Sequence, residues 1–229
     1  MPHGDRRQPA ASDGTLILVR HGQSETNAAN IFTGTLDPPL TDRGVHEARE
    51  IGRHLRKLSL PPIDHAFSSP LQRAAHSLDH IFETYYDQQQ DLPPRSISPE
   101  LNERDYGDLN GRDKAKTAEE FGAEQVNAWR RSFRAVPPGG ESLEMTVDRV
   151  WAYYVREIQP RLARGECVLV VSHGNTLRGL CMKLDELDAD QVLKLTLGTG
   201  ALRIYRIDKV GHVTDRQLFA VDGLEGGRQ

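Results

Sequence analysis

The chain has 229 residues, of which 37 % are hydrophobic and 27 % charged, with a formal net charge of −4 at pH 7. These values are typical of a single globular domain with a sizeable core, and the negative charge argues against binding of nucleic acid or an anionic membrane. No apolar run approaches the ~20 residues of a membrane-spanning helix.

Residues 1–14 are polar and contain no apolar run of the kind found in secretory signals, so we expect a flexible N-terminal tail. Residues 15–19 form a short continuous apolar run, which predicts a fully buried strand. A helix is predicted over 42–57, because Thr41 is a suitable N-cap and apolar residues then recur at helical spacing until Pro61 and Pro62.

A second short strand is predicted over 65–68, followed by a helix to about residue 86 with Pro70 in its first turn. Residues 88–94 read as a solvated connector and 95–97 as a third strand. Residues 102–140 are rich in charged side chains, with short helical pieces at 114–121 and 123–131. We expect this segment to be a lid-like insertion over the sheet.

An apolar stripe from Leu143 to Leu162 predicts one long helix that stops at Gly165. Residues 167–172 form another continuous apolar strand, a helix follows His173, and two late strands are expected over 201–207 and 212–219. Alternating strands and helices predict an α/β fold with three layers, in which a mostly parallel sheet has helices on both faces. The whole would be a single catalytic domain over 15–220, with a flexible tail at 221–229.

The two cysteines, Cys167 and Cys181, are too few for a disulfide framework and lack the spacing of metal ligands. We expect both to be small buried residues, one on a strand and one on a helix. Their reduced state favours a cytoplasmic location.

Two of the predicted strands end in nearly the same way, with His21-Gly22 and with His173-Gly174. Ligands of open α/β sheets bind outside the carboxyl ends of the strands, and helix N-termini attract anions. A lone histidine at a strand end is usually structural. A matched pair, each followed by a glycine that lets the backbone approach a ligand, favours one shared pocket.

Several cations lie in segments around these histidines, although the protein is acidic overall, which indicates an anionic substrate. Guanidinium groups suit phosphate and carboxylate, while the alternative for any one of them is a solvated surface charge. The cations are Arg20, Arg73, Arg104, Lys114, Arg130 and Arg131. Glu103 is the carboxyl group best placed to transfer a proton, and its alternative role is a salt bridge to an arginine.

The segment from Leu18 to Ser24, with Arg20-His21-Gly22 at its centre, resembles the signature of the histidine phosphatase superfamily, and the Ser172–Asn175 segment resembles its second-histidine motif. Further segments resemble the 2,3-bisphosphoglycerate-dependent phosphoglycerate mutases. They are Asn27, Phe32-Thr33-Gly34, Leu40-Thr41, Arg73, residues 102–107, Lys114-Ala115, Trp129-Arg130-Arg131 and residues 139–143.

The resemblance implies that His21 is the phosphorylated nucleophile, that Arg20, Arg73 and His173 grip the transferred phosphoryl group, and that Glu103 gives and takes the proton. It implies that phosphates and carboxylate are held by Ser24, Asn27, Thr33, Gly34, Arg104, Tyr106, Lys114, Arg130, Arg131, Gly174 and Asn175. It also implies 2,3-bisphosphoglycerate as primer without a metal, a small anionic phosphorylated substrate, a role in glycolysis and gluconeogenesis, and a homo-oligomer, either dimer or tetramer.

These residues are compatible with three functions: a glycolytic mutase, a histidine phosphatase acting on a small phosphorylated metabolite, and a non-catalytic protein that kept the fold. The intact set of histidines, arginines and Glu103 argues against the third. The set of Lys114, Arg130 and Arg131 favours the mutase. Three departures from the mutase pattern bear on the phosphatase: Asp105 in place of a common histidine, a shorter segment at 137–140, and a short C-terminal tail.

Overall fold

The computed structural model describes residues 13–87 and 91–219, and the tails predicted at 1–14 and 221–229 fall almost entirely outside this part of the chain. The first strand starts at Gly14, one residue before the predicted boundary.

One sheet of six strands forms the centre of the described structure, in the order β3-β2-β4-β1-β5-β6. Strands β3, β2, β4 and β1 pair parallel with one another, whereas β5 pairs antiparallel with both β1 and β6. The strands are β1 (Gly14–Arg20), β2 (His65–Ser68), β3 (Arg95–Ile97), β4 (Cys167–Ser172), β5 (Leu202–Ile207) and β6 (Val213–Phe219). The predicted α/β fold with a mostly parallel sheet is confirmed.

The central strands β1 and β4 are buried on both faces, as their continuous apolar runs predicted. Because successive side chains of a strand point to opposite faces, each strand contributes to two separate cores. Leu16 and Leu18 pack on one side with Val168, whereas Ile17 and Val19 pack on the other. The sheet is therefore rigidly held at the level where β1 and β4 end.

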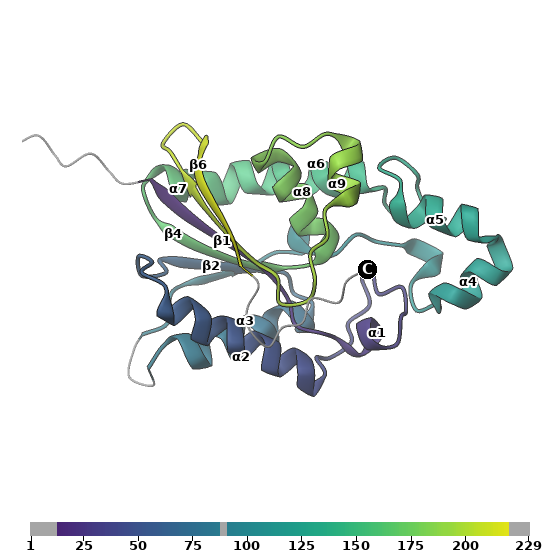
Figure 1. Cartoon of the computed structure of the whole chain (residues 1–229), viewed down its shortest axis with the longest axis horizontal. Helices are drawn as coiled ribbons and strands as arrows, with labels where there is room; N and C mark the ends of the chain where they lie inside the picture. The colour runs from purple at the N-terminus through teal and green to yellow at the C-terminus, as the bar shows by residue number, and fades with distance from the viewer. Residues whose placement is uncertain (1–12, 88–90, 220–229) are drawn as a thin grey trace, which may run out of the picture.

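Two helices, α2 (Asp42–Lys57) and α3 (Gln72–Tyr85), cover one face of the sheet (Figure 1). The predicted bounds of α2 are confirmed, and the Thr41 side chain caps it by accepting from the Gly44 amide. Helix α3 starts later than predicted, with Leu71 as its N-cap, so Pro70 lies just outside the first turn. Three residues, Ser69 to Leu71, connect the end of β2 to the helix.

The other face is covered by α6 (Leu143–Tyr153), α7 (Gln159–Ala163), α8 (Gly174–Leu184) and α9 (Ala189–Lys194) (Figure 1). The single helix predicted over 143–162 is wrong in one respect, because a π-helical turn at Tyr154–Ile158 interrupts it. Pro160 explains the interruption, since proline lacks an amide donor and its ring displaces the carbonyl four residues earlier. Gly165, with φ of 84°, ends the helix as predicted.

The segment expected to be a lid contains α4 (Lys114–Phe121) and α5 (Ala123–Arg131), with the predicted bounds, at one end of the sheet (Figure 1). Two 3₁₀ turns, Pro99–Leu101 and Gly107–Leu109, lead into it. It has a small core of its own, in which Phe32, Leu109 and Val126 are buried. Phe32 follows the short helix α1 (Glu25–Ala28), which the sequence did not predict.

Both cysteines are buried free thiols, Cys167 in β4 and Cys181 in α8, as expected. Within residues 13–87 and 91–219, no helix is long and apolar enough to cross a membrane.

Candidate active site

The two histidines predicted from the sequence to share a site, His21 and His173, lie next to each other in the structure. His21 follows β1 and His173 follows β4, and these neighbouring parallel strands end together because Arg20 pairs with Ser172 in their register. The ring centroids lie 4.9 Å apart in an edge-to-face arrangement, and both rings are buried. The structure therefore brings the two histidines together at the carboxyl ends of the strands.

His21 is oriented by its own backbone. Its Nδ1 lies 2.6 Å from the Gly22 carbonyl oxygen, which can only accept, so Nδ1 carries the proton and Nε2 keeps its lone pair. Burial, and then the neighbouring cations Arg73 and Arg20, hold the pKa of His21 well below its ordinary value. The imidazole is therefore neutral and nucleophilic at Nε2.

The glycines after the two histidines serve different purposes. A Cβ at Gly22 would lie 2.1 Å from the Gly44 carbonyl of α2, so this glycine is required by backbone packing and not by a ligand. A Cβ at Gly174 would instead lie 3.5 Å from the Arg20 guanidinium carbon and 3.6 Å from Glu103 Oε2. These distances at Gly174 are ordinary van der Waals contacts, and Gly174 lines the cavity.

Two buried arginines flank the histidines. Arg73 donates from Nη2 to the Gly34 carbonyl at 2.9 Å and from Nη1 to the Leu36 carbonyl at 2.6 Å, and burial lowers its pKa to about 10. Arg20 donates from Nη1 to the Leu197 carbonyl. Among the described residues, Arg20 Nε and His173 Nδ1 are buried without a hydrogen-bond partner. Two unsatisfied nitrogens beside the nucleophile suit the oxygens of a phosphoryl group.

Glu103 is held at the start of α8. Its Oε1 accepts hydrogen bonds from the backbone amides of Arg104, at 2.8 Å, and of Asn175, at 3.0 Å. The first turn of a helix favours a carboxylate, so the group is fixed without a salt bridge to Arg104. The salt-bridge alternative weighed for Glu103 is therefore not needed to explain its position.

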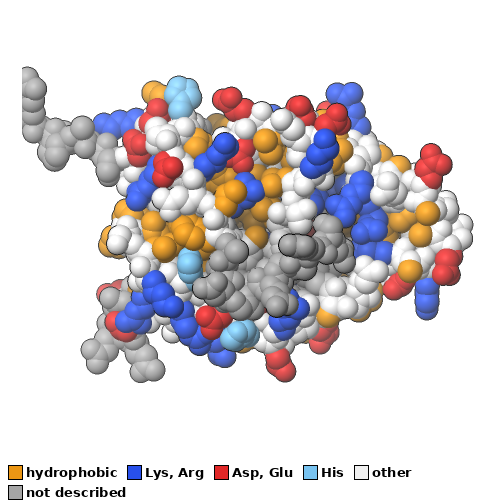
Figure 2. Space-filling model, viewed as in Figure 1, with side chains coloured by type: hydrophobic (Ala, Val, Ile, Leu, Met, Phe, Trp, Pro, Cys, Tyr) orange, Lys and Arg blue, Asp and Glu red, His pale blue; other side chains and the backbone are white. Residues whose placement is uncertain are grey.

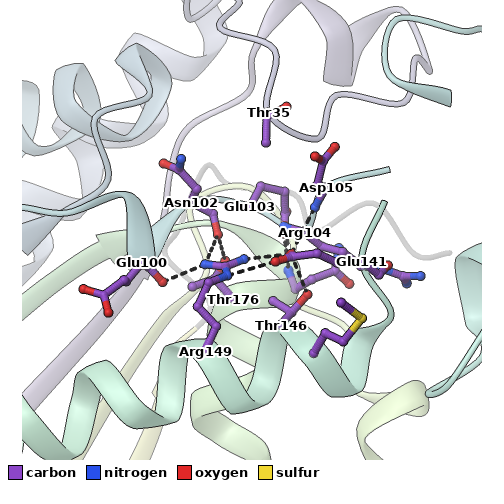
Figure 3. Close-up of polar contacts among 12 residues, drawn as sticks. Thr35, Glu100, Asn102, Glu103, Arg104, Asp105, Glu141, Thr146, Arg149 and Thr176 are labelled. Atoms are coloured by element: carbon purple, nitrogen blue, oxygen red, sulfur yellow. Dashed lines mark hydrogen bonds and ion pairs between the residues drawn. The ribbon is translucent and has the colours of Figure 1, made fainter. Parts of the chain in front are cut away.

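The segment that carries Glu103 is clamped from behind (Figure 3). Arg149 of α6 donates from Nη1 to the carbonyls of Glu100, at 2.7 Å, and of Asn102, at 3.3 Å, and pairs with Glu141 at 2.9 Å. Glu141 in turn accepts from the Asp105 amide at 3.3 Å. These contacts fix the backbone on both sides of Glu103.

His21, Arg20 and Arg73 line one cavity. A second group of cations, Lys114 of α4 with Arg130 and Arg131 of α5, lines the same cavity. The cavity has a volume of about 220 Å³. Its wall contains Arg20, His21, Asn27, Ile31, Phe32, Thr33, Gly34, Arg73, Glu103, Tyr106, Lys114, Arg130, Arg131, Gly174, Asn175, Arg178 and Leu197. Figure 2 shows Lys and Arg side chains gathered on the surface between α9 and α5, at this end of the molecule.

Lys114 lies among these cations. Burial, followed by repulsion from Arg130 and Arg20, lowers its pKa to about 8. Burial and the neighbouring Arg131 also lower the pKa of Arg130. Counted over the described residues, the cavity wall has six cations and a single carboxylate, Glu103, and it is suited to a ligand with several negative charges.

Three residues of the predicted site do not line the cavity. His173 lies just behind its wall, against His21. Ser24 is the N-cap of α1, where its hydroxyl donates to Asn27 Oδ1 at 3.0 Å. Arg104 is buried with its guanidinium on the carbonyls of Glu141, Trp129 and Ala135, at 2.7 to 3.1 Å. In this structure Ser24 and Arg104 hold the backbone next to the cavity and do not line it.

Two residues near the site were not predicted from the sequence. Arg178 lines the cavity, and its Nη1 donates to Asn175 Oδ1 at 3.3 Å. Its position three residues after Asn175 in a predicted helix was a usable signal, because such residues share a face. Ser69 contacts His173 from 104 positions away in the chain, and no local pattern marks it.

The chain belongs to the histidine phosphatase superfamily (branch 1), whose family model matches residues 16–217. Among curated relatives, the 2,3-bisphosphoglycerate-dependent phosphoglycerate mutase of Nitrobacter hamburgensis is 50 % identical over 197 residues, covering 86 % of this chain and 93 % of that protein. The mutase of the same name from Parvibaculum lavamentivorans is 46 % identical over 204 residues, covering 89 % and 95 %.

Solved structures of similar fold carry phosphatase names. The alpha-ribazole phosphatase from Shigella flexneri has a TM-score of 0.72 and 27 % identity, over 91 % of this chain and 96 % of that chain. A mycobacterial glucosyl-3-phosphoglycerate phosphatase has a TM-score of 0.70 and 22 % identity, over 90 % and 98 %, and shares the fold.

Proposed function

We propose that this protein is a phosphoglycerate mutase that interconverts 3-phosphoglycerate and 2-phosphoglycerate through a phosphohistidine at His21. One observation carries the proposal: a second set of cations, Lys114, Arg130 and Arg131, lines the same small cavity as His21. A phosphatase needs to hold the phosphoryl group being cleaved. A mutase must also retain a second anionic group while the molecule turns, and this second set supports that task.

At the His21 end, the residues present suit in-line phosphoryl transfer. Nε2 of His21 attacks phosphorus, and the N–P bond forms as the bond from phosphorus to the substrate oxygen breaks. Arg20, Arg73 and His173 surround the phosphoryl oxygens and stabilise their charge, which is the main catalytic task in such a reaction. Glu103 gives a proton to the departing oxygen and takes one back from the hydroxyl that attacks in the return step.

At the far end, Lys114, Arg130 and Arg131 would bind the carboxylate or the second phosphate, with Asn27, Thr33 and Tyr106 completing the wall. Because the cations come from α4 and α5, this end belongs to the segment predicted to act as a lid. Closure of that segment over the cavity, which would exclude water from the phosphohistidine, is part of the proposal.

The residues also fit 2,3-bisphosphoglycerate as primer. The unpartnered Arg20 Nε and His173 Nδ1 suit one phosphate, and the lid cations suit the other. When bound, the bisphosphate would supply the phosphoryl group that first charges His21. The proposal includes the role in glycolysis and gluconeogenesis, the cytoplasmic location and the homo-oligomeric state expected from the sequence.

The second candidate is a phosphatase for a small phosphorylated acid. It is favoured by the Shigella flexneri structure, which is named an alpha-ribazole phosphatase and is 27 % identical to this chain. The same His21 chemistry would serve, with water as the acceptor of the phosphoryl group.

An enolase-coupled assay on 3-phosphoglycerate separates the two candidates. It is run with and without trace 2,3-bisphosphoglycerate while free phosphate is followed in parallel, and the His21→Ala variant reports any contaminating mutase. We expect 2-phosphoglycerate to form faster than free phosphate and to depend on the bisphosphate. Release of free phosphate as the main product would reject the mutase in favour of the phosphatase.

A further inference from the structure

Among the described residues, Ser69 makes the one hydrogen bond to the imidazole of His173. Its Oγ lies 2.7 Å from His173 Nε2, and both side chains are fully buried. Ser69 directly follows β2, and β2 pairs with β4, the strand that ends at His173. The contact is therefore set by the sheet and brings together two residues that are 104 positions apart.

His173 is neutral in this environment. Its pKa is lowered well below the ordinary value by burial first, and then by Arg73, His21 and Arg20. A neutral imidazole carries one proton, on either Nδ1 or Nε2, and the hydrogen bond made by one nitrogen decides the state of the other. The partner at Nε2 is Ser69, while Nδ1 has no partner among the described residues.

The two tautomers differ in what they leave unsatisfied. If Nε2 carried the proton and donated to Ser69, the buried serine hydroxyl would have no acceptor in the described structure, and a lone pair on Nδ1 would repel a phosphoryl oxygen. If the Ser69 hydroxyl donates to Nε2, its proton is used and Nδ1–H becomes a donor. Buried hydroxyl groups are rarely left unsatisfied, so the second arrangement is favoured.

We propose that Ser69 is a positioning residue that holds His173 as the Nδ1–H tautomer, so that His173 donates a hydrogen bond to the phosphoryl group carried by His21. This rests on the proposed phosphohistidine chemistry, but it is the same for a mutase and a phosphatase.

The two histidines then have complementary roles, because the partner of His21 accepts a hydrogen bond whereas the partner of His173 donates one. Both carry their proton on Nδ1. At His21 the Gly22 carbonyl accepts from Nδ1 and frees Nε2 to attack, whereas at His173 a hydroxyl donates to Nε2 and frees Nδ1–H to bind an oxygen. The ring centroids of the two histidines lie 4.9 Å apart. Nε2 of His21 and Nδ1–H of His173 can thus act on one phosphoryl group without any proton exchange between them.

The tautomer can be read directly by NMR of the whole protein labelled with ¹⁵N-histidine. Protonated and unprotonated ring nitrogens resonate in separate ranges, and a His173→Asn variant assigns the signal among the nine histidines. We expect the proton on Nδ1 of His173, and we expect that signal to shift when orthovanadate is added as a phosphoryl probe. A proton on Nε2 would overturn the proposal, whichever reaction the protein catalyses.

Ser68 provides a matched control, because it is adjacent, fully buried, and its Oγ has no partner in the described structure. Ser69→Ala should slow the formation of phosphohistidine about tenfold with little change in KM. The reason is that the hydrogen bond from His173 to the charged phosphoryl group is lost. Ser68→Ala should stay within about twofold. Equal loss in both variants, or an unchanged His173 tautomer in Ser69→Ala, would contradict the role.

A hydroxyl can be restored at the same place by Ser69→Thr. We expect this variant to keep the Nδ1–H tautomer even if the added methyl group lowers its stability. If Ser69→Ala does not fold, the tautomer of the unmodified protein and of Ser69→Thr still decide the proposal. An Nε2–H tautomer in either would reject it.

Discussion

The Arg104 guanidinium donates a hydrogen bond of 2.9 Å to the carbonyl of Trp129, the residue that precedes Arg130. The same guanidinium bonds to the Ala135 carbonyl at 3.1 Å and to the Glu141 carbonyl at 2.7 Å. Arg104 also directly follows Glu103. One buried side chain therefore connects the segment of Glu103, the carboxyl expected to transfer the proton, to α5, the helix that carries Arg130 and Arg131.

We predict that Arg104→Met destabilises the fold as well as the site. The change leaves three backbone carbonyls without their donor, and we expect a loss of roughly 2–4 kcal/mol in the free energy of unfolding. Urea denaturation measures it, with the exposed Arg134→Met as control. A variant of unchanged stability that only loses substrate affinity would instead support the direct substrate contact predicted from the sequence.

Arg130→Ala should weaken ligand retention more than it slows the charging of His21. Arg130 lines the cavity from α5, so in the proposed mechanism its loss removes an interaction with the second anionic group. We expect KM for 3-phosphoglycerate to rise about 10- to 100-fold, as for one charge-assisted contact. Steady-state kinetics and labelling of the phosphohistidine measure the two effects.

The matched control for this experiment is Arg134→Ala. Arg134 lies in the same segment but is 81 % exposed and pairs with Glu144 at 3.4 Å. It should leave both quantities unchanged. Equal losses in KM and in phosphohistidine formation for Arg130→Ala would argue against its assignment to the second anionic group.

The pH dependence of kcat/KM should report Lys114. Its pKa is lowered to about 8, so the ammonium group is charged below pH 8 and loses its charge as the pH rises through that value. Because the charged form attracts the anionic substrate, kcat/KM should be constant below this pH and fall above it, by up to about tenfold per pH unit. Rates measured from pH 6.5 to 9.5 test this.

Lys114→Met should have a lower kcat/KM at neutral pH and should lack the fall near pH 8. Arg73 stays charged over this range, since its lowered pKa is still about 10. A profile that keeps the same fall in Lys114→Met would assign the titration to another group.

Glu103→Gln should lower kcat by about 10² to 10⁴, the usual effect of removing a general acid–base group. Glutamine keeps an oxygen that can accept from the amides of Arg104 and Asn175, so the backbone should stay in place. Glu100→Gln is a suitable control, since Glu100 pairs with the exposed Arg156 away from the cavity. If both variants kept full activity, the proton-transfer role of Glu103 would be refuted.

Much of the fold could be predicted because its signals are local. The continuous apolar runs of β1 and β4 and the helical spacing of α2 depend on the burial of neighbouring residues, and their predicted positions are confirmed. The long helix over 143–162 was predicted only in part, because periodicity does not respond to the proline that forces a π-helical turn. The short helix α1 was missed, since four residues carry too little periodicity.

The sequence by itself determined which chemistry the site contains. Two histidines at the ends of buried strands and a collection of arginines predict an anion site, because residue type and position on a strand can be read from the chain. Only the tertiary structure decided how each side chain is used. Arg104 donates to backbone carbonyls, Gly22 packs against Gly44 of α2, and Ser69 hydrogen-bonds to His173. Sheet pairing and helix packing bring these partners together from distant parts of the sequence.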